Sequence, residues 1–249
     1  MEIPEVSYEH LLILCEKPEF INALVQLTEE VVACCQAPEK HCGGKFQHPK
    51  NTLIVGPTQC GKSTLVENIL REKSISPWPI VRYVFTDKQS DTFENWKRED
   101  LITDYFIGLD KDRLNRLTEN SNTDQPQLII IDDLMSEASK SDILPNLFSR
   151  GSHHSNTSVI FITQDLYSGP KLKTCKQNTH YLVYFNNPAN DQLSLFTSKA
   201  DKKYRQHIKD IYEKYVERRP YGYMIIDLNQ DNCGTIYRGI PFQHCHLPK

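Results

Sequence analysis

The sequence predicts an α/β fold in which a mainly parallel central sheet lies between two layers of helices. Residues 52–55 form a short apolar run, a glycine-containing segment follows at 56–63, and apolar residues with helical spacing continue through 64–70. Residues 128–131 are four consecutive apolar residues, which is typical of a strand that is buried on both faces. Both observations favour a layered α/β domain with its strands inside.

Composition sets limits on this domain. The chain has 249 residues, a length typical of one large domain or one and a half domains. Hydrophobic residues make up 39% of it, which is enough to form a buried core. The net charge of −3 lacks the overall basic signature of a nucleic-acid coat protein, so any contact with nucleic acid would come from local loops. The sequence has no apolar run of about 18 residues, so we expect no membrane span.

The glycine-containing segment fits the phosphate-binding loop pattern G-x-x-x-x-G-K-[ST], and reads Gly56-Pro57-Thr58-Gln59-Cys60-Gly61-Lys62-Ser63. Glycine permits backbone angles that turn the loop amides inward, and the following helix N-terminus adds positive potential for a phosphate. We expect Lys62 to reach the β- and γ-phosphates of ATP and the Ser63 hydroxyl to ligate Mg²⁺. The whole loop together with Thr64 is the predicted nucleotide-binding set.

Polar residues end two of the predicted strands. Asp132 and Asp133 follow the apolar run 128–131, a Walker B pattern in which Asp132 would hold Mg²⁺ and Asp133 would position the attacking water. The alternative is a pair of carboxylates that cap a helix. Thr163 and Gln164 end the apolar run 158–162 and resemble a sensor of the γ-phosphate; the alternative is a polar strand terminus.

The remaining elements complete the predicted domain. Residues 1–48 are expected to form a helical leader that covers part of the sheet, before an ATPase domain at 49–249. Residues 88–126 are mixed, with a polar helix near 110–120. Residues 134–150 are expected to form either one helix or a helix that is broken at Pro145. Further strands are expected at 80–85 and 180–185, helices at 189–198 and 201–218, and a terminal hairpin at the sheet edge over 223–237.

The cysteines raise two questions. Cys60 stands at a helix N-terminus beside Lys62, which predicts a lowered pKa and enhanced reactivity; the alternative is a small residue that fits the loop. Two patches contain cysteine and histidine without clean C-x-x-C spacing, so a shared zinc site is open and unpaired thiols are favoured. The patches consist of Cys34, Cys35, His41, Cys42 and His48, and of Cys233, His244, Cys245 and His246.

Four segments in this order carry a family resemblance: the phosphate loop 56–63, Ile129-Ile130-Ile131-Asp132-Asp133-Leu134, Leu147-Phe148-Ser149-Arg150-Gly151-Ser152-His153-His154, and Val159-Ile160-Phe161-Ile162-Thr163-Gln164-Asp165-Leu166. Together they resemble the genome-packaging ATPases of Polinton/Maverick elements and adintovirus-like viruses. That group belongs to the FtsK–HerA superfamily of P-loop NTPases and is similar to poxvirus-type packaging ATPases. The resemblance covers about residues 50–190, and its Arg-Gly-Ser-His-His loop is more specific than the Walker motifs.

The resemblance implies a hexameric ring that hydrolyses ATP with Mg²⁺ and drives double-stranded DNA into a capsid. Capsid or portal proteins would be its partners, and its place would be intracellular, in the virion, the host nucleus or a cytoplasmic viral factory. It also implies that Lys62 and Ser63 bind phosphate and Mg²⁺, that Asp132 binds the metal, and that Gln164 is the sensor. Many superfamily members have glutamate where this chain has Asp133, whose side chain is one methylene shorter.

Basic residues outside the loop are further candidates. Arg150 follows a helix after the Walker B strand, beside a Gly-Ser pair, and we expect it to act on the nucleotide of a neighbouring subunit; Arg218 and Arg219 are rivals, and a surface salt bridge is the alternative. Lys171, Lys173 and Lys176 are candidate DNA contacts, or a solvated charged face.

Two functions other than a motor are also open for a chain with this loop. A monomeric nucleotide or nucleoside kinase would need a lid with several arginines, for which basic residues at 97–98 and 111–116 could serve, but Thr163-Gln164 fits it poorly. A scaffold protein that binds nucleotide without turnover is the second alternative, and the intact Lys62 and Asp132 argue against it.

Overall fold

The computed structural model describes residues 46–72, 78–86, 91–119, 125–151, 156–165, 167, 172–187, 192–197, 202–217, 219–229, 236–238 and 243–244. The chain divides into two compact units, residues 1–43 and 44–249, and the described residues belong to the second. The helices expected within 1–48 therefore lie outside the described residues.

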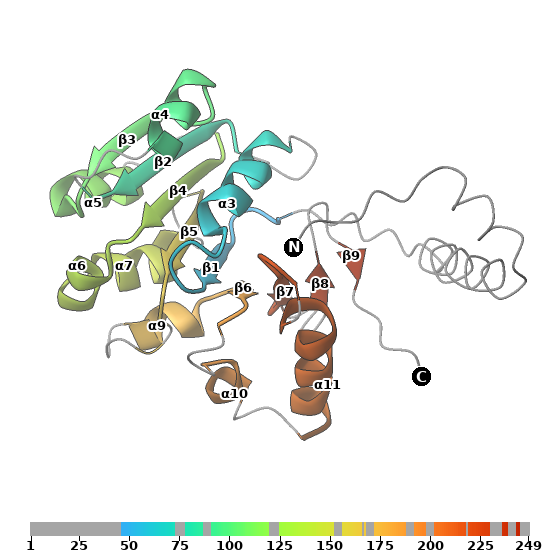
Figure 1. The fold of residues 1–249 in the computed structure, drawn as a ribbon. Helices are drawn as coiled ribbons and strands as arrows, with labels where there is room; N and C mark the ends of the chain where they lie inside the picture. The colour runs from blue at the N-terminus through green and yellow to red at the C-terminus, as the bar shows by residue number, and fades with distance from the viewer. Residues whose placement is uncertain are drawn as a thin grey trace, which may run out of the picture. The chain divides into compact units, whose positions relative to one another are not determined.

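A single sheet forms the centre of the described unit (Figure 1). Its six parallel strands lie in the order β3 (Asp104–Ile107), β2 (Ile80–Phe85), β4 (Gln127–Asp132), β5 (Thr157–Thr163), β1 (Asn51–Val55) and β6 (Tyr181–Phe185). Three antiparallel strands continue it: β7 (Tyr223–Asp227), β8 (Ile236–Arg238) and β9 (Gln243–His244). The predicted mainly parallel sheet and its terminal hairpin are confirmed.

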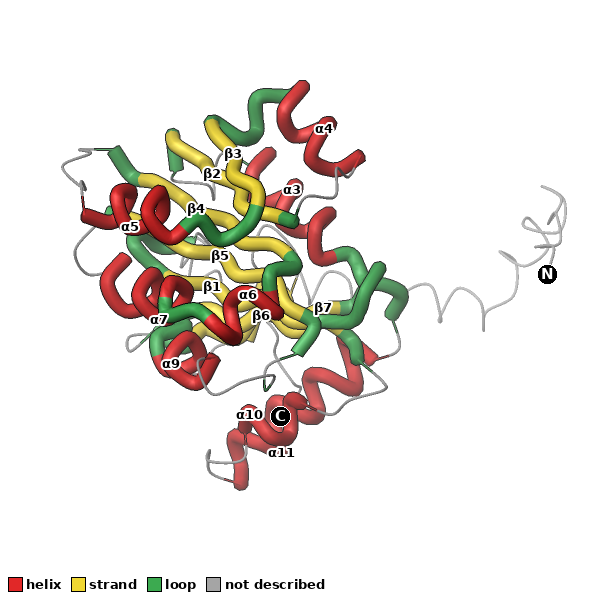
Figure 2. The backbone as a smooth tube through the Cα atoms, turned by 90° about the vertical axis from the view of Figure 1, so that its left-hand side faces the viewer, coloured by secondary structure: helices red, strands yellow, loops and turns green. Residues whose placement is uncertain are grey.

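Helices cover both faces of this sheet (Figure 2). They are α3 (Lys62–Arg71), α4 (Asp91–Arg98), α5 (Lys111–Glu119), α6 (Met135–Lys140), α7 (Ile143–Asn146), α9 (Leu172–Gln177), α10 (Gln192–Thr197) and α11 (Lys202–Tyr212), with π-helical turns η1 (Leu147–Gly151) and η2 (Glu213–Glu217). The helix expected over 134–150 is broken, as its proline indicated, into α6, α7 and η1.

Alternation along the central strands divides the core into two clusters. Leu53 and Val55 of β1 pack in the cluster with α5, α6, α7, α9 and α11, whereas Ile54 packs in the cluster with α3 and α4. Successive side chains of a strand point to opposite faces, so a strand that is apolar at every position needs helices on both sides. The predicted three-layer sandwich follows from this alternation.

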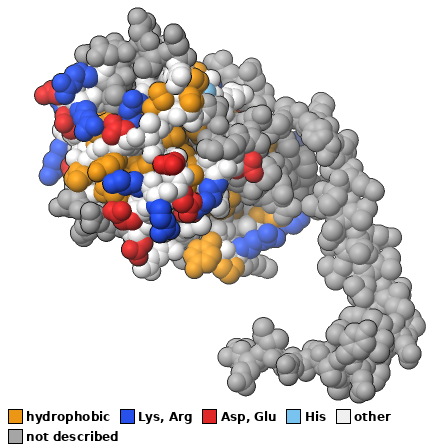
Figure 3. All heavy atoms as spheres, turned by 90° about the horizontal axis from the view of Figure 1, so that it is seen from above, with side chains coloured by type: hydrophobic (Ala, Val, Ile, Leu, Met, Phe, Trp, Pro, Cys, Tyr) orange, Lys and Arg blue, Asp and Glu red, His pale blue; other side chains and the backbone are white. Residues whose placement is uncertain are grey.

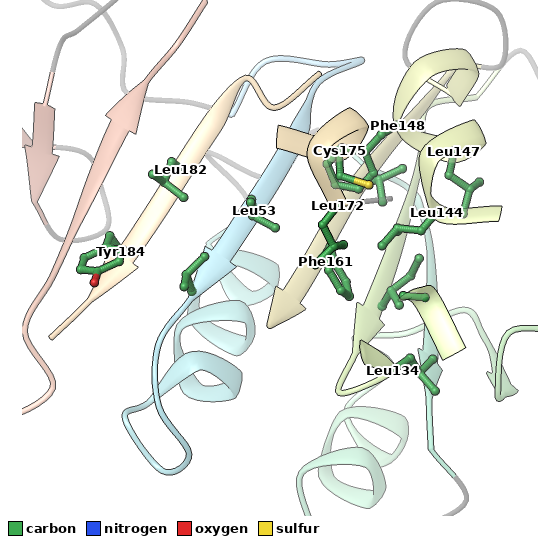
Figure 4. Close-up of a cluster of buried hydrophobic side chains, with 14 of the residues drawn as sticks. Leu53, Leu134, Leu144, Leu147, Phe148, Phe161, Leu172, Cys175, Leu182 and Tyr184 are labelled. Atoms are coloured by element: carbon green, nitrogen blue, oxygen red, sulfur yellow. The ribbon is translucent and has the colours of Figure 1, made fainter. Parts of the chain in front are cut away.

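The larger cluster shows how the helices fix the strands (Figure 4). Phe161 on β5 is completely buried, and Leu172 and Cys175 of α9 pack in the same cluster. Leu144 of α7 and Phe148 of η1 complete this part of the layer. Tight packing of this kind holds β5 in place, and β5 is the strand that ends in the predicted sensor.

The sequence reading left β3 and α4 unassigned within the mixed segment 88–126. Strand β3 lies at the edge of the sheet, and Phe106 is its buried residue, so it has little of the apolar pattern of an inner strand. Helix α4 buries Phe93 and Trp96 on one face and is otherwise polar. Short elements with one or two buried residues carry a weak sequence signal.

Strand order decides what meets at the carboxyl edge of the sheet. Strand β5 lies between β1 and β4, so the strand that leads into the phosphate loop and the strand that ends in two aspartates are not neighbours. Because all three strands are parallel, their carboxyl ends reach the same edge. The loop after Val55, the carboxylates at Asp132 and Asp133, and Gln164 therefore come together.

Candidate functional site

The phosphate loop has the backbone that its glycines predict. Gly61 has φ +96° and Gln59 has φ +62°, both in the left-handed region. A Cβ on Gly56 would lie 2.6 Å from Phe185 Cβ and 2.7 Å from Cys60 Sγ, so no larger residue fits there. The Gly56 amide donates to the carbonyl of Thr163, 3.2 Å away, which ties the loop to the end of β5.

Lys62 lies across the loop. Its Nζ donates to the carbonyl oxygens of Gly56, at 2.8 Å, and Pro57, at 2.6 Å. These bonds hold the ammonium over the loop, where it can exchange carbonyl partners for phosphate oxygens. The geometry fits the predicted phosphate-binding role of this lysine, whose ammonium donors point into the loop.

Asp132 has a partner that the sequence reading missed. The Tyr83 hydroxyl, on the neighbouring strand β2, donates to Asp132 Oδ2 over 2.8 Å, and the Tyr83 side chain is buried. Burial raises the pKa of the Asp132 carboxyl above its ordinary value, with the Tyr83 hydrogen bond acting against this effect. Burial likewise raises the pKa of Tyr83, so its hydroxyl stays protonated and remains a donor.

Asp133 and Gln164 meet at the ends of neighbouring strands. Asp133 is exposed, with φ +52°, and the Gln164 amide donates to its Oδ1 at 3.4 Å. The left-handed turn at Asp133 directs this carboxylate differently from that of Asp132, although the two residues are adjacent. The two aspartates therefore have distinct surroundings, one against Tyr83 and one beside the exposed glutamine.

The predicted residues line one cavity of about 280 Å³. Its lining includes Lys62, Ser63, Asp132, Asp133 and Gln164, so the structure brings together the loop and both polar strand ends. A hydroxyl and a carboxylate oxygen suit Mg²⁺, which commonly takes few protein ligands and completes its shell with water and phosphate. Ser63 and Asp132 therefore fit the predicted metal role.

A second cavity, of about 520 Å³, flanks the loop. It shares Gln59, Lys62 and Ser63 with the first cavity but extends past Thr64, along helix α3. Its other walls include three aromatic residues: Phe185 at the end of β6, Tyr221 in the turn before β7, and Tyr223 at the start of β7. The sequence reading gave these aromatics no role beyond the core.

The predicted lowering of the Cys60 pKa is wrong. Burial raises the pKa of its thiol, and this effect outweighs the nearby charge of Lys62, whose Nζ lies 4.0 Å from the sulfur. Cys60 packs against the apolar cluster on the α3 side of the sheet. A thiol in such surroundings favours its neutral form, whatever the position of the helix N-terminus.

Arg150 lies far from its own phosphate loop along the sheet. It belongs to η1, where the carbonyl of Phe148 accepts a 2.7 Å hydrogen bond from Asn51 Nδ2 at the first residue of β1. The phosphate loop follows the last residue of β1, which places it roughly 16 Å away along a five-residue strand. Two other arginines are rivals for this role. Arg219 is exposed, and its guanidinium carbon lies 5.7 Å from the centroid of the Tyr215 ring. Arg218 lies outside the described residues.

The candidate DNA-contacting lysines lie around α9. Lys173 is exposed. The Lys176 Nζ lies 3.7 Å from the centroid of the Tyr167 ring, and burial lowers the pKa of this lysine. Lys171 lies outside the described residues. On the face shown in Figure 3, basic and acidic side chains of the described residues are interspersed.

The described residues contain neither a grouped set of metal ligands nor a helix that could span a membrane. Within the described ranges, no three histidine, cysteine or acidic side chains are grouped to hold a metal ion. The proposed zinc patches fall mostly outside those ranges, and His48 is hydrogen-bonded through Nε2 to Asn156 and through Nδ1 to Ser158. None of the helices in the described part of the chain has the length and hydrophobicity that crossing a bilayer requires.

A comparison with known protein families places most of the described residues within one family. A family model described as "Poxvirus A32 protein" matches residues 46–227, which include the loop, both polar strand ends and β7. No curated protein sequence matches the chain.

Solved structures share the fold at low sequence identity. The DNA-packaging ATPase B204 from Sulfolobus Turreted Icosahedral Virus has 12% identity and a TM-score of 0.54, covering 77% of this chain and 98% of that chain. The genome packaging NTPase B204 from Sulfolobus turreted icosahedral virus 2, in complex with AMPPCP, has 15% identity and a TM-score of 0.52, covering 75% and 95%. At these identities the likeness is one of fold.

Proposed function

Since the chain belongs to the family of the poxvirus A32 protein, we propose that it is an ATPase that packages viral DNA. The observation that carries this proposal is the cavity in which Lys62 and Ser63 face Asp132, Asp133 and Gln164. These are the groups that phosphoryl transfer to water needs: a cation, a metal site and side chains that orient water. The B204 proteins, with which the chain shares its fold, are packaging enzymes, and one was solved with AMPPCP.

Each residue has a proposed task in hydrolysis. The loop from Gly56 to Thr64 wraps the phosphates with its amides, and Lys62 neutralises charge on the β- and γ-oxygens. Ser63 and Asp132 would hold Mg²⁺, which when bound adds positive charge at the phosphates. Asp133 and Gln164, which contact each other, orient the attacking water. Hydrolysis becomes fast when a further arginine approaches the γ-phosphate.

We assign that arginine to Arg150 of a neighbouring subunit. Its backbone lies at the opposite end of β1 from its own loop, which supports action on the phosphates of a neighbouring chain in the proposed ring. The proposed assembly is a hexameric ring around double-stranded DNA. Lys171, Lys173 and Lys176 are the proposed DNA contacts.

The proposed setting is viral. The partners are capsid or portal proteins, and the place of action is intracellular, in the virion, the host nucleus or a cytoplasmic viral factory. Within the packaging ATPases, we place the chain nearest the Polinton/Maverick and adintovirus type, on the four segments that carry that resemblance. We further propose that residues 49–249 form the ATPase domain and 1–48 a separate leader.

ATP hydrolysis with and without duplex DNA tests this function. We expect the purified chain to hydrolyse ATP, DNA to accelerate hydrolysis, and Lys62→Ala to abolish it while the fold is kept. Lys203→Ala, which removes an exposed lysine from α11, is the matched control and should behave as the wild type. Turnover that persists in Lys62→Ala would place the chemistry elsewhere. Phosphoryl transfer to a nucleoside acceptor, unaffected by DNA, would support the kinase instead.

A further inference from the structure

The two cavities beside the phosphate loop differ in chemistry. The smaller one contains the carboxylates of Asp132 and Asp133, whereas the larger one is walled by Phe185, Tyr221 and Tyr223. A nucleoside triphosphate has a charged tail at one end and a flat aromatic base at the other. The larger cavity is also of the size that small-molecule sites usually have.

The loop sets the direction in which a nucleotide would lie. Thr64 and Asn68, on helix α3, line the larger cavity and not the smaller one. If the terminal phosphate faces Asp132, the rest of the nucleotide must leave the loop on the side of Thr64. The base then enters the cavity that the aromatic residues line.

Tyr221 is placed over the loop by a constrained turn. A Cβ built on Gly61 would lie 3.6 Å from Tyr221 Cδ1, so the tyrosine ring covers this glycine of the phosphate loop. Tyr221 has φ +56°, a conformation that is unfavourable for a bulky residue, and the residue is 71% exposed. An exposed ring in a strained conformation contributes little to the core, and such strain is concentrated at functional sites.

Neighbouring residues hold this turn. A Cβ on Gly222 would lie 2.4 Å from the Val216 carbonyl oxygen, so the chain passes η2 too closely for any side chain. The Gly222 amide donates to the Arg219 carbonyl at 3.0 Å, and its carbonyl accepts from the Asn186 amide at 3.1 Å. The turn is thereby fixed to the end of β6, which also supplies Phe185.

The geometry points to a base-binding site: we propose that the cavity of Phe185, Tyr221 and Tyr223 takes the ribose and purine base of the nucleotide, with the base stacked on Tyr221. The ring centroids of Phe185 and Tyr223 are 5.2 Å apart, and these two residues form the apolar floor. Stacking on an aromatic side chain does not read the edge of the base, so any preference for purines would come from the larger ring surface that a purine stacks. The proposal rests on the proposed function, because it takes the phosphates to lie in the loop.

Binding of ATP and of inorganic tripolyphosphate, measured by calorimetry on the full chain, separates the base from the phosphates. We expect Tyr221→Ala to weaken ATP binding about tenfold, the usual scale for loss of one stacking partner, and to leave tripolyphosphate binding within about twofold. Tyr221→Phe should keep the ATP affinity of the wild type, because the ring is retained. Tyr105→Ala, which removes another exposed tyrosine at the opposite edge of the sheet, is the control.

A Tyr221→Trp variant gives a second readout that does not depend on the alanine variant folding. Its additional fluorescence over the wild type should be quenched by ATP and not by tripolyphosphate. Equal weakening of both ligands in Tyr221→Ala, an unchanged ATP affinity, or quenching by both ligands would overturn the base site. A wild-type chain that binds neither ATP nor tripolyphosphate would instead overturn the proposed function.

Discussion

Two adjacent aspartates have different surroundings in this protein. Asp132 accepts a hydrogen bond from the buried Tyr83, whereas Asp133 turns out to solvent through a left-handed backbone and meets Gln164. The sequence predicted both carboxylates at this strand end, and the structure places both beside one cavity. The sequence could not predict the hydrogen bond from Tyr83 to Asp132. A tyrosine in an apolar strand produces the same sequence pattern whether or not its hydroxyl makes a hydrogen bond.

Asp133→Asn tests which residue orients the attacking water. The amide keeps the size of the carboxylate but loses its charge, so we expect ATP to bind normally and hydrolysis to slow by about 10²-fold or more. Nucleotide binding and single-turnover hydrolysis, measured separately, check this expectation. Asp165→Asn, which changes a nearby aspartate outside the cavity lining, is the control. Normal hydrolysis in Asp133→Asn would transfer the task to Gln164.

Asp132→Asn should weaken Mg²⁺ binding and raise the stability of the protein in the absence of Mg²⁺. Burial raises the pKa of Asp132 in the folded state, so keeping this carboxylate charged at neutral pH lowers the free energy of unfolding. The wild type regains this stability as the pH falls through the raised pKa and the carboxylate is protonated. Without Mg²⁺, we expect the variant to melt above the wild type at pH 7, by the roughly 2–4 °C that 1 kcal/mol produces in a domain of this size.

The difference in melting temperature between Asp132→Asn and the wild type should shrink as the pH falls. Thermal melts at a series of pH values would measure this change. With Mg²⁺, the variant should bind ATP more weakly than the wild type. A melting difference that does not change with pH would mean that the charge of Asp132 is not the cause.

Strand pairing provides contacts that no local pattern contains. The strands at 52–55, 80–85, 128–131, 158–162 and 180–185 were predicted from their apolar runs, and each has a counterpart in the sheet. The order of these strands depends on pairing between distant segments, so the position of β5 between β1 and β4 was beyond local patterns. Only that order explains how Thr163 contacts the loop while Gln164 contacts Asp133.

Tyr83→Phe tests a contact that depends on the pairing of β2 with β4. The variant keeps the ring and loses the hydroxyl that fixes Asp132 Oδ2. We expect the Mg²⁺ concentration for half-maximal ATPase activity to rise several-fold, as for other groups that orient a metal ligand. The maximal rate at saturating Mg²⁺ should change less, which distinguishes a positioning role from a loss of structure.

Tyr105→Phe removes an exposed tyrosine hydroxyl from the neighbouring strand β3 and serves as the control. An unchanged Mg²⁺ requirement in Tyr83→Phe would show that Asp132 holds its geometry without this hydrogen bond.

At the scale of the assembly, Arg150 is expected to complete the site of a neighbouring subunit. An arginine of this kind contributes about 10³–10⁵ in rate, so Arg150→Ala should bind ATP and assemble but hydrolyse slowly. Mixing it with Lys62→Ala should restore part of the activity, because an intact Lys62 site of one chain then meets an intact Arg150 of the other.

The mixing experiment is followed by ATPase rate and by mass in solution with an ATP analogue and duplex DNA. The mass gives the subunit number and shows that mixed rings form. Mixed rings that stay inactive at every ratio would place the required arginine elsewhere, with Arg219 as the next residue to change.

Strand β5 spans the distance between the phosphate loop and the region of Arg150. Its carboxyl end contacts the phosphate loop of its own chain, and its amino end, at Thr157, follows the segment that carries Arg150. In the proposed ring, this seven-residue strand, roughly 23 Å long, would connect the site of its own chain with the site that Arg150 is proposed to reach. We expect the subunits to hydrolyse ATP in turn, in one direction around the ring. ATPase activity should then fall more steeply than in proportion to the fraction of Arg150→Ala subunits. A linear fall would indicate that the sites act independently.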